Sequence, residues 1–384
     1  WGLDRRIALV VMSFVGTTPK RMVFGLMLTT TFLSAFMSNT ATAAMMVPVA
    51  MALITLVHST KAAGDPDAVT HERNFSLCIL LALAYGASIG GMATLIGSPP
   101  NGIYMRFMEQ TYGQVVSIAS WMKVGVPVTL LLFIVSFFVL TGLMFRNMGG
   151  SVPGGKEWVR NELRSMGKLS TGEKAVGLCF LIAAVLWFSG AQLRGINIDG
   201  WQPFKYLTDA VIAMGMGIVP FLIPVDRKGT MAMDWKTANE AISWDVLLLF
   251  GGGLSLASAI QHTGVAQLIG AQVAVLAGSP FPVVLFGVVF IVTFATGVTS
   301  NTALAAMMMP LLAAVANALG LPPQPILMGT ALAASAAFIL PISTPPNAIV
   351  FGTGKIKIAD MFRAGILINF VAIFVITGVM LLLD

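Results

Sequence analysis

An eleven-residue segment occurs twice in this sequence, and each copy opens with the same polar tripeptide in apolar surroundings. Residues 38–48 are SNTATAAMMVP and residues 300–310 are SNTALAAMMMP, so nine of eleven positions are identical at a constant offset of 262. Chance does not produce such a match. The chain is therefore expected to contain two related halves, each with one Ser-Asn-Thr turn.

The composition around both copies is that of a membrane protein. Of the 384 residues, 57% are hydrophobic and only 10% are charged, whereas about 25% of the residues of a soluble domain are charged. Apolar runs long enough to cross a hydrocarbon core of about 30 Å recur along the chain. We expect an all-α polytopic protein of the plasma membrane, which in a bacterium is the inner membrane. The net charge of +6 is explained by basic cytoplasmic loops and does not indicate nucleic-acid binding.

A second pair of motifs follows the two tripeptides. GSPPN at residues 97–101 and STPPN at residues 343–347 each place two prolines and an asparagine, Asn101 or Asn347, within an apolar segment. Proline removes a backbone donor and clashes with the preceding turn, so a helix breaks there. Carbonyls freed in the hydrocarbon layer are costly unless protein, ion or solute satisfies them. We expect these breaks to form part of a binding site.

The distribution of basic residues predicts the topology. Segment 146–174 carries six Lys or Arg residues and is expected to be a solvated, amphipathic cytoplasmic linker and not a lipid-recognition site. When the spans are counted outward from this linker, the later basic loops lie in the cytoplasm only if 281–318 is a hairpin. Both ends of that hairpin must lie on the same side of the membrane. Basic residues also precede and follow the first tripeptide, which places both ends of the hairpin at 19–57 in the cytoplasm; they are Lys20, Arg21, Lys61 and Arg73. With 18 of the 22 basic residues inside, the two hairpins enter from opposite faces, as in an inverted repeat.

The expected architecture is an inverted-topology repeat with two re-entrant helical hairpins and two broken transmembrane helices. The first repeat, 1–145, has its hairpin at about 19–57, its broken helix at about 75–108 and a span at about 121–145. The second repeat, 175–384, follows the linker, with spans at about 175–190, 209–225 and 244–262, a hairpin at about 281–318, a broken helix at about 326–357 and a last span at about 364–383. Only 37 residues precede the first tripeptide and about 125 separate the linker from the second, so about 90 residues of scaffold, or three spans, are expected to be missing on the N-terminal side.

The polar groups at the turns and breaks are typical of an uncharged binding site. Ser, Asn and Thr supply hydrogen bonds without a fixed charge that would be costly in an empty membrane site. Helix N-termini favour an anion, and free C-terminal carbonyls favour a cation such as sodium. No carboxylate lies at mid-span for proton coupling, and no Lys or Arg lies in either turn. A dianion would therefore need cations bound beside it.

Other features receive plainer interpretations. Cys78 and Cys179 lack any partner spacing and are expected to be core residues. The glycine-rich run at residues 250–258 lacks the Lys-Ser/Thr ending of a phosphate-binding loop. Trp121 lies near an expected interface and is assigned to an aromatic belt. No nucleophile–base pair or metal cluster occurs, so neither an enzyme nor a cofactor is expected, apart from co-transported Na+.

The two Ser-Asn-Thr turns and the two Pro-Pro-Asn breaks together resemble the divalent anion:sodium symporter (DASS) family of the ion transporter superfamily. The resemblance covers nearly the whole chain and implies a homodimer that works by an elevator-type alternating-access mechanism. It implies two sodium sites, formed by Ser34, Ser38, Asn39 and Gly97 and by Thr296, Thr299, Asn301 and Ser343. Ser343 stands where members often have a small apolar residue, a difference that matters little if only its carbonyl binds. The implied solute contacts are Asn39, Thr40, Ser98, Asn301, Thr302 and Thr344.

The function implied is sodium-coupled secondary active transport of small divalent anions, most specifically C4-dicarboxylates such as succinate, fumarate and malate. The alternatives are a sulfate or citrate carrier of the same family and, from another class, an anion channel or arsenite-exporter-like protein. Saturable uptake that requires sodium distinguishes a symporter from a pore. The expected partners are a small dianion, sodium ions, the lipid bilayer and a second copy of the chain.

Overall fold

Helices make up nearly all of the regular structure. The computed structural model describes residues 1–59, 67–150, 154–199, 201–242, 244–265, 268 and 278–383. Within these ranges, strand-type pairing is limited to two isolated bridges, which join Ile198 to Trp201 and Pro224 to Met231. The expectation of an all-α fold is confirmed. Lys61 and residues 151–153 of the expected linker lie outside the described residues.

The helices follow one another with short connections. Those that precede the linker are α1 (Leu3–Val15), α2 (Pro19–Ser34), α3 (Asn39–Ser59), α4 (Ala68–Gly91), α5 (Pro99–Tyr112), α6 (Ile118–Phe138) and the π-helical segment η1 (Val139–Met144). Those in the linker and the middle of the chain are α7 (Gly155–Ser165), α8 (Thr171–Arg194), α9 (Asp209–Ile218), the 3₁₀ segment η2 (Val219–Phe221), α10 (Trp235–Ala241) and α11 (Trp244–His262). The last are α13 (Phe281–Ala295), α14 (Asn301–Ala318), α15 (Pro323–Ser335), the 3₁₀ segment η4 (Pro341–Ser343), α16 (Pro345–Phe351) and α17 (Ile358–Leu383).

Six of the described helices are long and apolar enough to cross a membrane. One of them, α4, lies at the centre of the molecule. In its most apolar stretch 94% of the residues are buried, whereas the corresponding fraction in the other five helices is 44% or less. The other five leave apolar side chains uncovered, as a lipid-facing helix does. Expected span 209–225 is shorter than predicted and forms a 13-residue apolar helix, Asp209–Phe221. The six are Asn39–Ser59, Ala68–Gly91, Ile118–Met144, Thr171–Gly190, Asn301–Ala318 and Ile358–Leu383.

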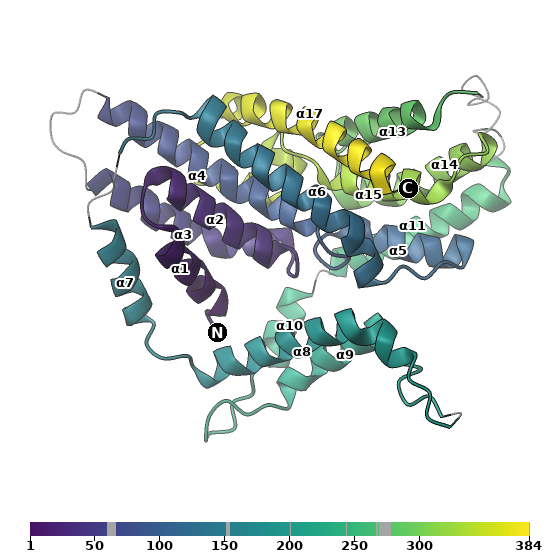
Figure 1. Cartoon of the computed structure of the whole chain (residues 1–384), viewed down its shortest axis with the longest axis horizontal. Helices are drawn as coiled ribbons and strands as arrows, with labels where there is room; N and C mark the ends of the chain where they lie inside the picture. Colours follow the sequence, from purple (N-terminus) through teal and green to yellow (C-terminus); the bar gives the residue numbers. More distant parts are fainter. Residues whose placement is uncertain are drawn as a thin grey trace.

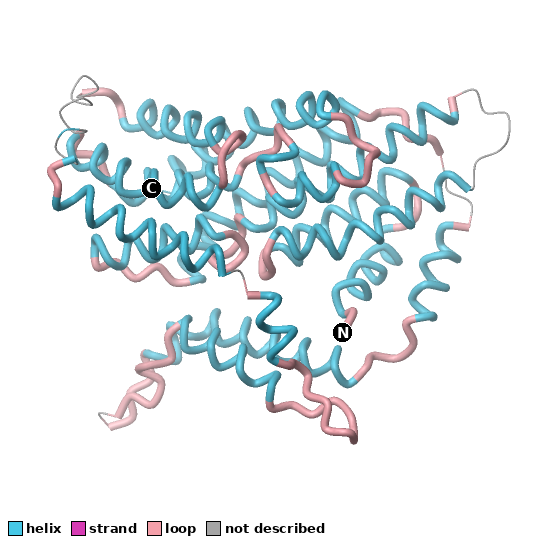
Figure 2. The backbone as a smooth tube through the Cα atoms, turned by 180° about the vertical axis from the view of Figure 1, so that it is seen from behind, coloured by secondary structure: helices cyan, strands magenta, loops and turns pink. Residues whose placement is uncertain are grey.

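The helices pack in two matching sets. In the first set α4 packs against α2, α3 and α6, and in the second α15 packs against α13, α14 and α17. The sets also exchange elements, since α5 contacts α14 and α15 whereas α16 contacts α3 and α4 (Figure 1). Each short helix after a break thus packs on the other set. Loops between these helices lie in the middle of the helical body, as Figure 2 shows, and not only at its ends.

The linker is less solvated than the sequence suggested, because α7 packs against α1. Val159 of α7 is buried in this contact. Arg6 of α1 donates from Nε to Glu173 Oε1 at 2.6 Å and from Nη1 to Gly167 O at 2.9 Å. These bonds tie α1 to the start of α8. Helices α8, α9 and α10 run along one side of the body formed by the two matching sets (Figure 1).

One close approach in the core requires glycine. A Cβ atom at Gly365 of α17 would collide with the backbone carbonyl of Phe338, which precedes the second Pro-Pro-Asn motif. Asn369, one turn further along α17, accepts a hydrogen bond from the Phe338 backbone N–H at 3.2 Å. The missing side chain at Gly365 therefore lets α17 approach closely enough to hold this segment.

We expect Gly365→Ala to destabilise the folded protein by about 1–3 kcal/mol, because an extra methyl group against a fixed backbone is overpacking. Gly378→Ala in the same helix is the control, since nothing lies within 4 Å of a Cβ atom there. Thermal unfolding of the purified protein in detergent measures both. Equal melting temperatures for the two variants would contradict the packing described.

Candidate functional site

The first Ser-Asn-Thr turn lies between α2 and α3, and its side chains gather against α4. Ser34 Oγ donates to the Ala87 carbonyl at 2.7 Å and lies 2.7 Å from the side-chain amide of Asn39. With its amide nitrogen facing inward, Asn39 donates to the carbonyls of Gly97 and Ala87, both at 3.1 Å. We call Ser34, Asn39, Ala87 and Gly97 the first polar cluster.

The second turn lies between α13 and α14 and repeats this arrangement. Thr296 Oγ1 donates to the Ala334 carbonyl at 2.7 Å and lies 2.8 Å from Asn301 Oδ1. Thr296 and Asn301 stand 262 positions after Ser34 and Asn39, the same offset as that of the tripeptides. We call Thr296, Asn301 and Ala334 the second polar cluster. A hydroxyl, an amide and a helix carbonyl thus meet in the same way in both halves.

The asparagines of the Pro-Pro-Asn motifs close the two helix breaks. Asn101 Nδ2 donates to the carbonyls of Gly91 and Thr94, both at 2.8 Å. Asn347 Nδ2 donates to the carbonyls of Ala337 at 3.2 Å and Leu340 at 3.0 Å. Both asparagines are fully buried. Each side chain satisfies two carbonyls that the broken helix leaves without partners, which is why the motif requires an amide at this position.

Hydroxyl groups connect each turn to the break beside it. Thr94 Oγ1 donates to the Ala35 carbonyl in the first half, and Ser343 Oγ donates to the Gly297 carbonyl at 2.7 Å in the second. Ala35 and Gly297 are again 262 positions apart. The hydroxyl of Ser343 therefore has a structural role of its own, apart from any role of the Ser343 carbonyl.

The two halves meet at the breaks themselves. Ser98, the residue just before α5, has its Oγ 3.0 Å from Oγ of Ser335, the last residue of α15. Thr344 occupies the equivalent place before α16 and caps that helix by accepting from the Asn347 N–H at 3.3 Å. Ser98, Ser335 and Thr344 are all buried. The residues before α5 and α16 are therefore both buried, and Ser98 joins the first break to the end of α15.

Some predicted residues have side chains turned elsewhere. Ser38 is exposed, and its Oγ accepts from the Ala41 N–H at 3.2 Å as a helix cap. Thr299 is also exposed, and its hydroxyl donates back to the Ala295 carbonyl at 2.9 Å. Thr40 and Thr302 are the second residues of α3 and α14; Thr40 is exposed and Thr302 is buried.

Several contributors were not predicted. The carbonyls of Ala87 and Ala334 carry no side-chain signature, and Ser335 belongs to neither motif. Trp121 was assigned to an aromatic belt, which is wrong, because the side chain is fully buried and donates from Nε1 to the Met92 carbonyl at 2.9 Å. The one sequence signal for such a donor is the GSPPN motif, because a helix break frees backbone carbonyls that need hydrogen-bond donors nearby. Trp121 is thus part of the first break.

Neither polar cluster contains a charged side chain, and the partial charges there come from helix ends and polar groups. Among the described residues, Glu173 is the one charged side chain that is buried, and it pairs with Arg6 outside both clusters. No group of three or more His, Cys, Asp or Glu residues that could hold a metal ion occurs in the described chain. The first residues of α3 and α5 lie near each other, since Asn39 contacts Gly97 two residues before Pro99. Helix N-termini of this kind stabilise an anion, and neutral oxygens can bind an alkali cation.

Comparisons with solved structures show the same fold at low sequence identity. The chain is similar to MtrF of Neisseria gonorrhoeae, with a TM-score of 0.64 and 14% identity, over 99% of this chain and 78% of that one. It is similar to the YdaH transporter of Alcanivorax borkumensis, described as having an unusual topology, with a TM-score of 0.60 and 13% identity, over 99% and 82% of the two chains.

Sequence comparisons are more specific. The chain is 37% identical over 381 residues to the sodium-dependent dicarboxylate transporter SdcS of Staphylococcus saprophyticus, covering 98% of this chain and 72% of the relative. It is 36% identical over 378 residues to SdcS of Staphylococcus aureus, covering 98% and 71%. Residues 1–383 match the family described as the sodium:sulfate symporter transmembrane region. This multi-pass membrane protein therefore belongs to the sodium:sulfate symporter family, a family of transporters and not of enzymes.

Proposed function

We propose that the protein is a sodium-coupled symporter of small divalent anions and that C4-dicarboxylates are its substrates. The observation that carries the proposal is the pair of equivalent uncharged polar clusters inside an apolar helical body. A polar cavity without charged side chains binds a dianion poorly by itself, because helix ends contribute only partial charges. Sodium ions at the two clusters would supply the missing positive charge, which couples the solute to the cation.

The proposed sodium sites are the two turns with their adjacent breaks. The 2.7 Å approach of Ser34 to Asn39 and the 2.8 Å approach of Thr296 to Asn301 support this assignment. Oxygen atoms already converge there, and exchanging one hydrogen bond for an ion needs little rearrangement. The first site would use Ser34, Ser38, Asn39 and Gly97, and the second would use Thr296, Thr299, Asn301 and Ser343, partly through backbone carbonyls.

The solute site is proposed between the two clusters. It would use the first turns of α3 and α14 and the residues before α5 and α16, where backbone N–H groups lack partners within the helix. The approach of Ser98 to Ser335, which brings both breaks together, supports this placement. The residues proposed to contact the carboxylates are Asn39, Thr40, Ser98, Asn301, Thr302 and Thr344.

The choice of substrate rests on the relatives. Two proteins at 36–37% identity are sodium-dependent dicarboxylate transporters, whereas the family description names sulfate. We take the named relatives as the better guide to the substrate, because the similarity to them covers 98% of this chain. We therefore propose succinate, fumarate and malate as substrates over sulfate or citrate. We also propose that the hairpins are re-entrant, that the chain forms a homodimer, and that the body formed by the two matching sets slides past α8–α10 as an elevator.

We expect Asn39→Ala and Asn301→Ala each to abolish sodium-dependent succinate uptake, because each removes the side chain at the centre of one cluster. Uptake of labelled succinate into proteoliposomes, with sodium or potassium outside, measures this. Asn161→Ala is the control, since Asn161 is an exposed residue of α7. Competition by unlabelled citrate and sulfate tests the substrate choice. Wild-type uptake in both cluster variants would reject the site, and uptake that persists without sodium would reject symport.

A gentler change tests the first sodium site separately. A Cβ atom at Gly91 would collide with the side-chain amide of Asn39, so Gly91→Ala must displace that side chain. We expect the sodium concentration for half-maximal uptake to rise roughly tenfold, the effect of about 1.4 kcal/mol of lost binding energy. Gly287→Ala in α13 has open space around the added methyl and is the control. An unchanged sodium dependence in Gly91→Ala would remove Asn39 from the sodium site.

A further inference from the structure

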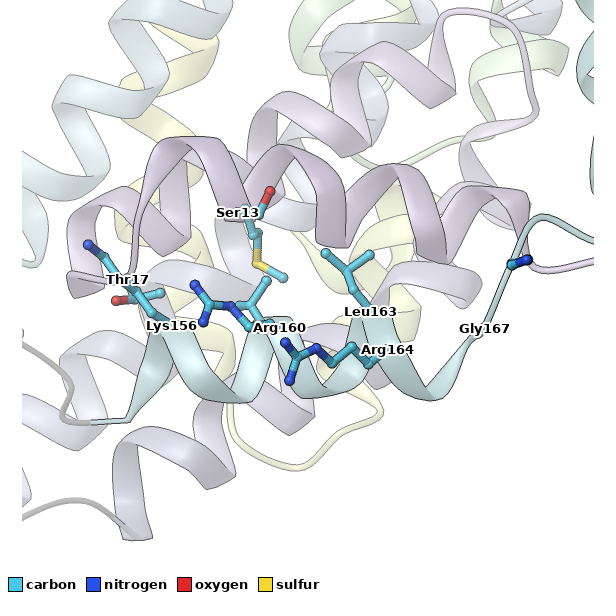
Figure 3. Close-up of a pocket in the computed structure, with 10 residues that line it drawn as sticks. Ser13, Thr17, Lys156, Arg160, Leu163, Arg164 and Gly167 are labelled. Carbon is cyan, nitrogen blue, oxygen red and sulfur yellow. The ribbon is translucent and has the colours of Figure 1, made fainter.

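A cavity of about 750 Å³ lies between α1 and α7, apart from both polar clusters (Figure 3). Its floor is apolar, since Met12 of α1 and Val159 of α7 are buried and Leu163 of α7 is half-buried. Hydroxyl groups of Ser13 and Thr17 line it from the side of α1. Its rim is cationic and consists of Lys156, Arg160, Arg164 and Lys168.

The rim carries positive charge without a counter-charge. Lys156, Arg160 and Arg164 follow one another at intervals of four residues, so they share one side of α7 (Figure 3). None of the described residues that line the cavity is acidic. In the described part of the chain the four rim cations form no ion pair, and the nearby Glu162 is already paired with Arg5. Like charges at this spacing repel each other, so an anion in the cavity would stabilise the fold.

The surroundings of the cavity indicate an anion with an apolar part. On α1, Phe14 beside the cavity-lining Ser13 is 85% exposed, and Val10 one turn earlier is 39% exposed. A free inorganic anion gains nothing from the apolar floor of the cavity or from the exposed apolar side chains of α1. A phospholipid matches both, because its phosphate can meet the cations while its acyl chains lie against apolar side chains at the membrane surface.

We propose that the cavity between α1 and α7 binds the phosphate headgroup of an anionic phospholipid. The basic character of the linker places it on the cytoplasmic side, where anionic lipids attract basic segments. The bound lipid would bridge α7 of the linker and α1, the helix that leads directly into the first hairpin. Arg160 and Arg164 hold the phosphate, and Lys156 and Lys168 extend the positive surface at its two ends.

The test measures lipid binding and does not depend on transport. The full-length protein is delipidated in detergent, titrated with phosphatidylglycerol or phosphatidylcholine, and its bound lipids are counted by native mass spectrometry. The variant Arg160→Gln/Arg164→Gln removes two rim cations, and Lys156→Gln/Lys168→Gln is a second variant in case the first fails to fold. Arg227→Gln/Lys228→Gln is the control, because these exposed loop residues lose the same charge elsewhere.

Wild type and control are expected to bind phosphatidylglycerol in preference to phosphatidylcholine. Each rim variant should bind phosphatidylglycerol roughly 25-fold more weakly, since each basic residue near an anionic surface contributes about fivefold. Equal binding in the rim variants and the control would overturn the proposal. So would equal binding of both lipids by wild type. Displacement of phosphatidylglycerol by inorganic phosphate at equal concentration would identify a free-anion site and also overturn it.

Discussion

Backbone carbonyls that are left free where a helix breaks must find donors within the protein, because a hydrocarbon layer offers no water. In this molecule the donor is the same side chain in both halves. Asn101 reaches Gly91 and Thr94, and Asn347 reaches Ala337 and Leu340. Two short bonds from one amide allow an open loop at the centre of the fold. The hydroxyls of Thr94 and Ser343 then join each break to its turn, beside which the polar clusters form.

The exchange of elements between the two sets brings the two copies of the motif together. Each short helix after a break packs on the other set, α5 on α14 and α16 on α3. The residue before α5 therefore lies against the other set, where Ser98 contacts Ser335. Because the copies interlock, the proposed solute between them would contact both hairpins at once.

Much of this could be predicted from the sequence. The repeated tripeptide located both turns, and the prolines located both breaks, because proline acts on the backbone wherever it stands. The partners of these residues could not be predicted in the same way. Ala87 and Ala334 contribute carbonyls, which every residue possesses, so no residue type marks them. The hydroxyls of Ser38 and Thr299 belong to predicted positions yet cap or bond locally, because rotamers depend on neighbours that the sequence does not specify. Trp121 was misplaced because tryptophan is suited both to an interface and to a buried hydrogen bond.

The burial of α4 has a consequence for biosynthesis. This helix is covered on nearly every side in the finished protein, and part of its cover is α16, which begins more than 250 residues after α4 ends. While the ribosome is still making the intervening chain, α4 must rest against lipid or a membrane chaperone with its polar break uncovered. Completion of the centre of this protein is therefore a late, post-insertional event.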